Sequence, residues 1–260
     1  MKHISKIKGG IMFFFIITLS LLCCTSLHSS VGSLPIIKNA YKASPEYKVG
    51  VENFAFMIKT SDPIIKCTED DKILFREMCE ETLISTASGF VFSHDKESIF
   101  IMTAGHFCEP EKELIAEEKI SGFVGDQYRE LHYINHDLKL DVCILMGVKF
   151  TSESYNKIEF IDELPKIGEE IYTVAAPQGI AGEGIRPIFT GHFAGCDENV
   201  CMTTIQATFG SSGAGIFTKE GKLVSIVMAV SNGFDHVMIT PSHEKLKNYI
   251  MKLDESVDIY

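Results

Sequence analysis

Short apolar runs bounded by turn residues recur from residue 49 to residue 240, and this pattern limits the possible folds most strongly. Brief runs rich in Val, Ile, Phe and Thr are typical of β-strands. The predicted strands cover residues 53–59, 82–92, 98–103, 131–134, 142–148, 170–175, 186–193, 201–208, 214–217, 223–229 and 236–239. Residues 241–253 are helix-like, with an apolar stripe of Leu246, Ile250 and Leu253. Many strands before one closing helix predict an all-β chain of paired antiparallel barrels.

Length and charge narrow the function. The 260 residues suit one large all-β domain or two small barrels, and 45% hydrophobic residues are enough for a core. The net charge of −11 argues against nucleic acid as a partner, because phosphates demand Lys and Arg. It also argues against charge-driven binding to anionic lipid.

Residues 1–26 have the pattern of a targeting segment. A basic start is followed by an almost wholly apolar stretch at residues 11–24. This stretch is shorter than the roughly 20 residues of a membrane-spanning helix and has the length of a signal-peptide core. We therefore expect an exported protein, secreted or periplasmic. An uncleaved segment that attaches the protein to a membrane is the second alternative, and lipidation at Cys23 or Cys24 is the third.

Three polar residues stand next to apolar runs in an order that matters. His106 follows the apolar run at residues 98–103, Asp141 begins the run at 142–148, and Ser212 lies in the sequence GSSGAG at residues 210–215. Glycine lets the backbone turn sharply, so such a turn can present a hydroxyl and aim its N–H groups at one point. Taken alone, a Gly/Ser stretch is more often a plain turn between strands. The order His, Asp, Ser is that of the catalytic triad of chymotrypsin, which favours a catalytic role for these residues over a plain turn.

The motifs around these residues resemble those of trypsin-like (chymotrypsin-fold) serine proteases, nearer to bacterial Deg-type and viral members than to digestive trypsin. The matching segments are TAGH at 103–106 for T-A-A-H, DVCIL at 141–145 for D-L-A-L-L, GSSGA at 210–214 for G-[DN]-S-G-G, and APQGI at 176–180 for G-[NY]-P-x-G. The resemblance extends over about residues 49–253.

The resemblance implies two packed six-stranded antiparallel β-barrels, chymotrypsin-like, with a C-terminal helix. The expected division is residues 1–26 signal peptide or membrane anchor, 27–48 linker and 49–260 protease domain, with a first barrel at about 49–150, a second at about 165–240 and the helix at 241–253.

The resemblance also implies a serine endopeptidase that needs no cofactor. Ser212 would attack a peptide bond, His106 would take its proton, and Asp141 would orient the imidazole. The N–H groups of Gly210 and Ser212 would form the oxyanion hole. Ser211 is the weaker choice of nucleophile, because the family places the serine directly before the glycine. The alternative is a non-catalytic binding protein on the same fold, and a cysteine protease would need Cys at position 212.

The expected partner is a protein or peptide substrate. Gln206, six residues before Ser212, stands at the base of the specificity pocket that the resemblance implies. Because no carboxylate occupies this position, we expect no preference for Lys or Arg. Ala229 and Val230 predict a modest apolar pocket, and substrate would add as a strand near residues 227–230.

Six of the eight cysteines lie beyond the targeting segment, and export would permit disulfides. Cys196 and Cys201 flank a predicted hairpin tip and are candidates for a bridge. Cys67 and Cys79 are a second candidate pair, around a polar insertion. Cys108 and Cys143 are interpreted as buried free thiols, with a bridge as the less favoured alternative. We expect no metal site, because neither Cys-x-x-Cys nor His-Glu-x-x-His occurs.

Overall fold

The computed structural model describes residues 43–62, 82–110, 117–125, 127–148, 155–181, 184–231 and 234–257. All of them lie in the second of the chain's two units, Tyr41–Tyr260. The predicted targeting segment, residues 1–26, and most of the predicted linker lie outside the described residues.

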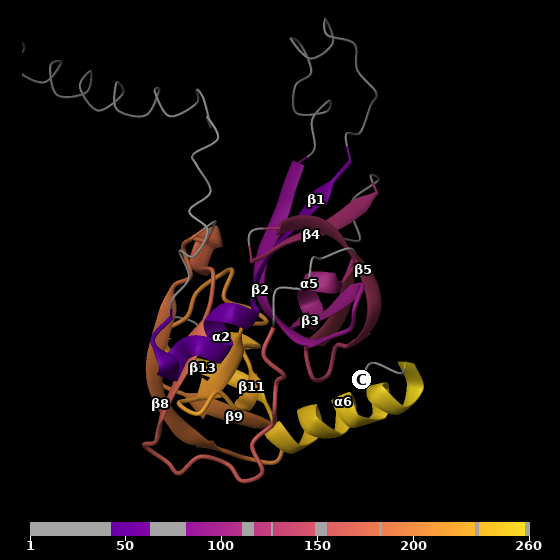
Figure 1. Cartoon of the computed structure of the whole chain (residues 1–260). Helices are drawn as coiled ribbons and strands as arrows, with labels where there is room; N and C mark the ends of the chain where they lie inside the picture. Colours follow the sequence, from indigo (N-terminus) through magenta and orange to yellow (C-terminus); the bar gives the residue numbers. More distant parts are fainter. Residues whose placement is uncertain are drawn as a thin grey trace, which may run out of the picture. The chain divides into compact units, whose positions relative to one another are not determined.

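The first half forms a closed antiparallel barrel (Figure 1). Its strands follow the order β1-β2-β3-β6-β5-β4. They are β1 (Phe54–Ser61), β2 (Thr82–His94), β3 (Ser98–Ala104), β4 (Glu118–Val124), β5 (Gln127–Asp137) and β6 (Val142–Val148). The barrel agrees with the predicted fold class. Strand β4 was not predicted, because Lys119, Ser121 and Gly122 weaken its apolar pattern.

The second half is a sheet in the order β11-β10-β7-β8-β9-β13-β12. Its strands are β7 (Glu170–Val174), β8 (Ile188–Cys196), β9 (Val200–Thr203), β10 (Gly215–Thr218), β11 (Leu223–Ile226), β12 (Ala229–Ser231) and β13 (Phe234–Pro241).

The first and last strands of this sheet are consecutive in the chain. Only Val227 and Met228 separate β11 from β12, so one interrupted pass of the chain pairs with β10 on one side and with β13 on the other. The chain changes partner between the two strands, because Val227 N–H donates to Ala214 O and Met228 N–H donates to Ile239 O. When β11 and β12 are counted as one interrupted strand, the sheet has six strands, the number predicted for the second barrel.

Short helical segments complete the fold. They are η1 (Pro45–Tyr47), α2 (Lys48–Asn53), α5 (Gly105–Cys108), η2 (Pro177–Gly179) and α6 (His243–Val257). Segment η1 gives the end of the predicted linker regular structure. Helix α6 covers the predicted closing helix from residue 243 onward, and its apolar stripe of Leu246, Ile250 and Leu253 is buried. Among the described residues, no helix is both long and apolar enough to span a membrane.

Strand alternation sorts the core into layers. In β1, Ala55 and Met57 join the interior cluster of the first barrel, whereas Phe54 and Phe56 join a cluster that also contains Tyr172 of β7. This shared cluster joins the two halves and takes in the stripe of α6, while a third cluster fills the second half. Both faces of these strands are therefore buried, which explains why the sequence shows continuous apolar runs instead of strict alternation.

Candidate active site

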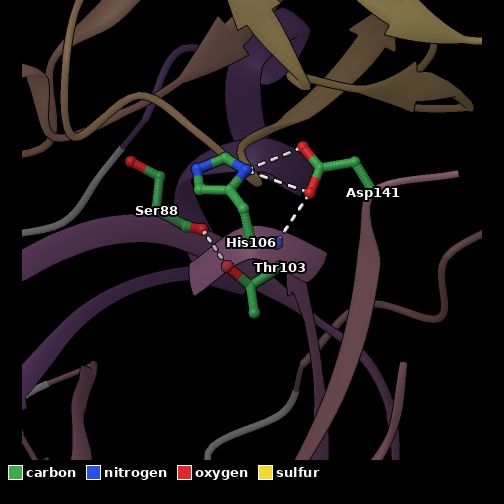
Figure 2. A network of polar contacts seen from close by, with 4 residues as sticks. All are labelled: Ser88, Thr103, His106 and Asp141. Atoms are coloured by element: carbon green, nitrogen blue, oxygen red, sulfur yellow. Dashed lines mark hydrogen bonds and ion pairs between the residues drawn. The ribbon is translucent and has the colours of Figure 1, made fainter. Parts of the chain in front are cut away.

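His106 and Asp141 come together because β3 and β6 are paired. Ala104, the last residue of β3, is opposite Val142, so the residues just beyond these strand ends are neighbours. His106 lies in α5, and its Nδ1 is 2.8 Å from Asp141 Oδ2 and 3.0 Å from Oδ1 (Figure 2). The backbone N–H of His106 donates to the same Oδ1 at 2.7 Å. Asp141 thus fixes both the ring and the backbone of His106.

The carboxylate also changes the acidity of the imidazole. Its hydrogen bond to Nδ1 is the main reason why the pKa of His106 is raised above the ordinary value of 6.5. Burial and the charge of Lys59 act in the opposite direction and are outweighed. The His106 side chain is half exposed while that of Asp141 is 11% exposed, so the carboxylate is the sheltered member of the pair.

Asp141 has an unusual backbone conformation. Its φ is 50°, in the left-handed region that costs most residues about 1–2 kcal/mol and that Asp tolerates better than most. The residue opposite is Gly105, where an added Cβ would lie 3.1 Å from the Asp141 carbonyl carbon. The two backbones therefore approach closely beside the His106–Asp141 contact.

Ser212 lies in a tight turn between β9 and β10. Gly210 and Gly213 on either side of it have φ of 87° and 82°. A Cβ on Gly210 would be 2.4 Å from Ala176 O, and one on Gly213 would be 2.4 Å from Ala104 N. Only glycine fits at either position, so the turn requires the predicted Gly-x-Ser-Gly pattern.

The predicted oxyanion-hole donors have no acceptor among the described residues. No described residue accepts a hydrogen bond from the backbone N–H of Gly210 or of Ser212, whereas Ser211 N–H donates to Thr208 O and Gly213 N–H donates to Val227 O. Ser212 itself is half-buried, and no hydrogen bond joins its hydroxyl to His106 within the described residues. Such contacts are commonly long without substrate.

The residues predicted to bind substrate occupy two places. Gln206 is exposed in the segment after β9, and Ala229 and Val230 are half-buried in β12. Strand β12 ends the sheet order and pairs only with β13, so its other edge has no strand partner within the described residues. An extended peptide could add there.

The described part of the chain contains two disulfides. The predicted bridge of Cys196 and Cys201 is present, with a Cα–Cα distance of 3.9 Å. The interpretation of Cys108 and Cys143 as free thiols is wrong: they are bonded to each other, with a Cα–Cα distance of 6.4 Å. The strand register places Thr103 opposite Cys143, which brings the end of α5 within reach of β6. Cys67 and Cys79 lie outside the described residues.

Sequence reasoning missed two residues of the site. Ser88 in β2 is fully buried and contacts the turn around Ser212 from the first barrel. Its only signal is a polar Ser-Gly pair inside a strand that is otherwise apolar toward the core. Phe209, directly before Gly210, is 86% exposed, an unusual position for a large aromatic side chain.

No group of three or more His, Cys, Asp or Glu side chains in the described part of the chain could hold a metal ion. Both oxygens of Asp141 are already hydrogen-bonded to His106. The groups available for chemistry at this site are the imidazole, the hydroxyl of Ser212 and the free backbone N–H groups.

The profile of the trypsin-like peptidase domain matches residues 87–226, more than half of the chain. The protein therefore belongs to the trypsin-like peptidase family and is a protease by family. No curated protein matches the sequence significantly.

Solved structures support the fold. The serine endoprotease from Yersinia pestis is similar over 82% of this chain and 67% of its own, with 14% identity and a TM-score of 0.58. Rv3671c from M. tuberculosis, in an inactive serine-to-alanine form, is similar over 88% of this chain and 97% of its own, with 15% identity and a TM-score of 0.55. At such identities the likeness concerns the fold.

Proposed function

We propose that the protein is a serine-type endopeptidase in which His106, Asp141 and Ser212 form the catalytic triad. The observation that carries this proposal is the orientation of His106. Its Nδ1 is held by Asp141, and its Nε2 has no partner among the described residues. A carboxylate on Nδ1 selects the tautomer whose Nε2 can accept a proton, which is what a general base requires.

The reaction then proceeds through an acyl-enzyme. Ser212 Oγ attacks the peptide carbonyl, its proton passes to His106 Nε2, and the C–N bond breaks as His106 returns that proton to the leaving amine. Water next attacks the ester and releases the acid. The free N–H groups of Gly210 and Ser212 stabilise the negative oxygen in both steps, and each such donor lowers the barrier by about 3 kcal/mol.

Substrate is a protein or peptide bound as a strand along the open edge of β12. Ala229 and Val230 lie in this strand, and the absence of a carboxylate at Gln206 predicts no preference for Lys or Arg. Successive side chains of a strand point to opposite faces, and whichever of these two residues faces the pocket is apolar, which favours a small to medium apolar side chain at the cleavage site.

The test is hydrolysis of a fluorogenic peptide library by wild type and by variants. Ser212→Ala and His106→Ala should each lower kcat by about 10³-fold or more while melting at nearly the wild-type temperature. Ser211→Ala is the matched control and should retain most activity, because its hydroxyl makes only a long 3.4 Å contact with Thr208 N. Full turnover by Ser212→Ala would show that the nucleophile is misassigned.

We also propose that the protein is exported after cleavage near residue 26, with membrane attachment through the uncleaved segment as the alternative. The two disulfides support an oxidising compartment. Intact-mass measurement of the protein from the compartment where it accumulates decides between the two. Loss of about 26 residues supports a cleaved signal peptide, whereas a chain that still begins at Met1 supports the anchor.

A further inference from the structure

Ser88 connects the first barrel to the turn that carries Ser212. Its N–H donates to Ser212 O at 2.9 Å, and its Oγ donates to Gly210 O at 2.7 Å. The same Oγ accepts the N–H of Ala176 at 2.8 Å, and the Ser88 carbonyl accepts the hydroxyl of Thr103 at 2.9 Å (Figure 2). Every polar group of this fully buried residue is therefore hydrogen-bonded, and three of the four bonds reach the second half of the chain.

These bonds act on a turn whose geometry decides where two N–H groups point. The peptide between Gly210 and Ser211 is held at both ends, because Gly210 O accepts from Ser88 Oγ and Ser211 N–H donates to Thr208 O at 3.0 Å. Peptide units are planar, so fixing both ends fixes the orientation of the unit.

The preceding peptide is held in a similar way. Phe209 O accepts the N–H of Gln178 at 2.5 Å, which turns the N–H of Gly210 in the opposite direction. Gln178 has a φ of 52°, a left-handed conformation that is unfavourable for most residues other than glycine. The hydrogen bonds of the neighbouring peptide groups thus fix the direction of the Gly210 N–H, which has no acceptor among the described residues.

We infer that Ser88 is a positioning residue that holds the turn at residues 209–212 in the conformation needed for oxyanion binding. This inference rests on the proposed function. Without the Ser88 hydroxyl, Gly210 O and Ala176 N–H lose a partner in a buried site, which is unfavourable because buried polar groups need hydrogen bonds. Glycine has few barriers to rotation, so Gly210 can relieve this cost by rearranging. A rearranged turn no longer aims the N–H groups of Gly210 and Ser212 at one point.

The test measures the rate of covalent labelling by a fluorophosphonate, which needs no knowledge of the natural substrate. A bond forms between Ser212 Oγ and phosphorus, fluoride leaves, and the serine proton passes to His106. The phosphoryl oxygen occupies the oxyanion hole in the transition state, so the rate reports on the position of the two donors.

We expect Ser88→Ala to label about 10- to 100-fold more slowly than wild type, since loss of one whole donor costs roughly 10²–10³. The midpoint of the pH dependence of labelling should stay unchanged, because His106 and Asp141 are not altered. Hydrolysis of the best fluorogenic peptide should show a lower kcat with KM changed less than about threefold, which is typical of an interaction made only in the transition state.

Thr173→Val is the matched control. Thr173 is also fully buried, and its hydroxyl donates to Gly215 O at 2.7 Å, so the variant removes a buried hydroxyl bond within the second half of the chain without touching the oxyanion turn. It should lower the melting temperature about as much as Ser88→Ala does and should label at nearly the wild-type rate. Ser88→Cys keeps a weak donor in the same space and should fall between Ser and Ala in labelling rate.

If Ser88→Ala loses stability as Thr173→Val does but labels at the wild-type rate, the inference is overturned. If Ser88→Ala does not fold, Ser88→Cys decides alone, and an unchanged labelling rate in that variant overturns the inference equally. The proposed function fails separately, when wild type itself neither labels nor hydrolyses peptide, or when Ser212→Ala labels as fast as wild type.

Discussion

Cys108 is bonded to Cys143 across 35 positions, the same separation as that of His106 and Asp141. Each cysteine lies two residues beyond one member of the ion pair. The disulfide therefore ties the short helix α5 to strand β6, and the ion pair ties it to the residue directly before that strand. Since α5 has only one turn and little stability of its own, the covalent link keeps His106 in place when its side chain is half exposed.

The double variant Cys108→Ser/Cys143→Ser should lower the free energy of unfolding by about 4 kcal/mol, the loop-entropy value for a closed loop of this length. The bridge between Cys196 and Cys201 closes a much shorter loop, so Cys196→Ser/Cys201→Ser should lower the free energy of unfolding by only about 2 kcal/mol. Urea unfolding of both variants checks the order. A larger loss from the Cys196 and Cys201 pair would show that the first disulfide does not stabilise α5 as we describe.

The pH dependence of kcat/KM should have an acid limb with its midpoint above 6.5. A general base works only when neutral, and Asp141 raises the pKa of His106, so activity is lost as pH falls through this raised value. In Asp141→Asn the main raising contribution is gone while burial still lowers the pKa. The midpoint should therefore move to lower pH, and the plateau should drop by roughly 10⁴-fold. A wild-type midpoint at or below 6.5 contradicts this prediction.

Gly210→Ala should lower activity by at least about 10²-fold, the effect of losing an oxyanion donor. The added Cβ would meet Ala176 O at 2.4 Å, so the turn must shift. Gly168→Ala is the control, because Gly168 also has positive φ, 88°, but nothing lies within 4 Å of its Cβ position. It should cost about 1 kcal/mol of stability and leave kcat unchanged. Equal kcat values in the two variants would mean that the clash at Gly210 has no functional effect.

Lys59 should influence His106 from inside the first barrel. Its buried ammonium group donates to Glu109 O, at the end of α5, and pairs with Glu118 at 3.2 Å. Lys59→Met removes a positive charge that lowers the pKa of His106, so the acid limb should move to higher pH. Breaking the buried pair should also destabilise the protein by about 3 kcal/mol.

The control for this prediction is Lys119→Met, which removes a surface ion pair with Asp62. Surface pairs contribute at most about 1 kcal/mol, so both stability and the pH profile should stay close to wild type. If both lysine variants shift the profile equally, a general charge effect and not the position of Lys59 is responsible.

The strand pattern and four short motifs were enough to predict much of the fold. Most strands and the closing helix follow from the apolar runs, whereas the two six-stranded barrels were implied by the family resemblance. The break between β11 and β12 was not predictable, because residues 223–229 read as one continuous apolar run. The break arises where the N–H of Val227 donates to Ala214 O, and the sequence pattern does not show that these two segments are in contact.

Only those residues of the site that belong to a recognisable sequence motif were predictable. His106 and Asp141 stand out because one follows and the other begins an apolar run, and Ser212 stands out because glycines flank its turn. Ser88 does not, because a buried serine in a strand gives no sign of which carbonyl it will meet in the other half of the chain. The bond between Cys108 and Cys143 was missed for a related reason, since their proximity depends on the register of β3 against β6.

The most direct measurement of the central claim is mass-spectrometric mapping of the fluorophosphonate adduct on the folded protein. The account predicts one adduct, on Ser212, whose formation is lost in Ser212→Ala and His106→Ala and slows below the raised pKa of His106. Folding of each variant, checked by its melting temperature, excludes trivial loss. Labelling of wild type on Ser211 or another residue, or labelling of Ser212→Ala at the wild-type rate, would contradict it.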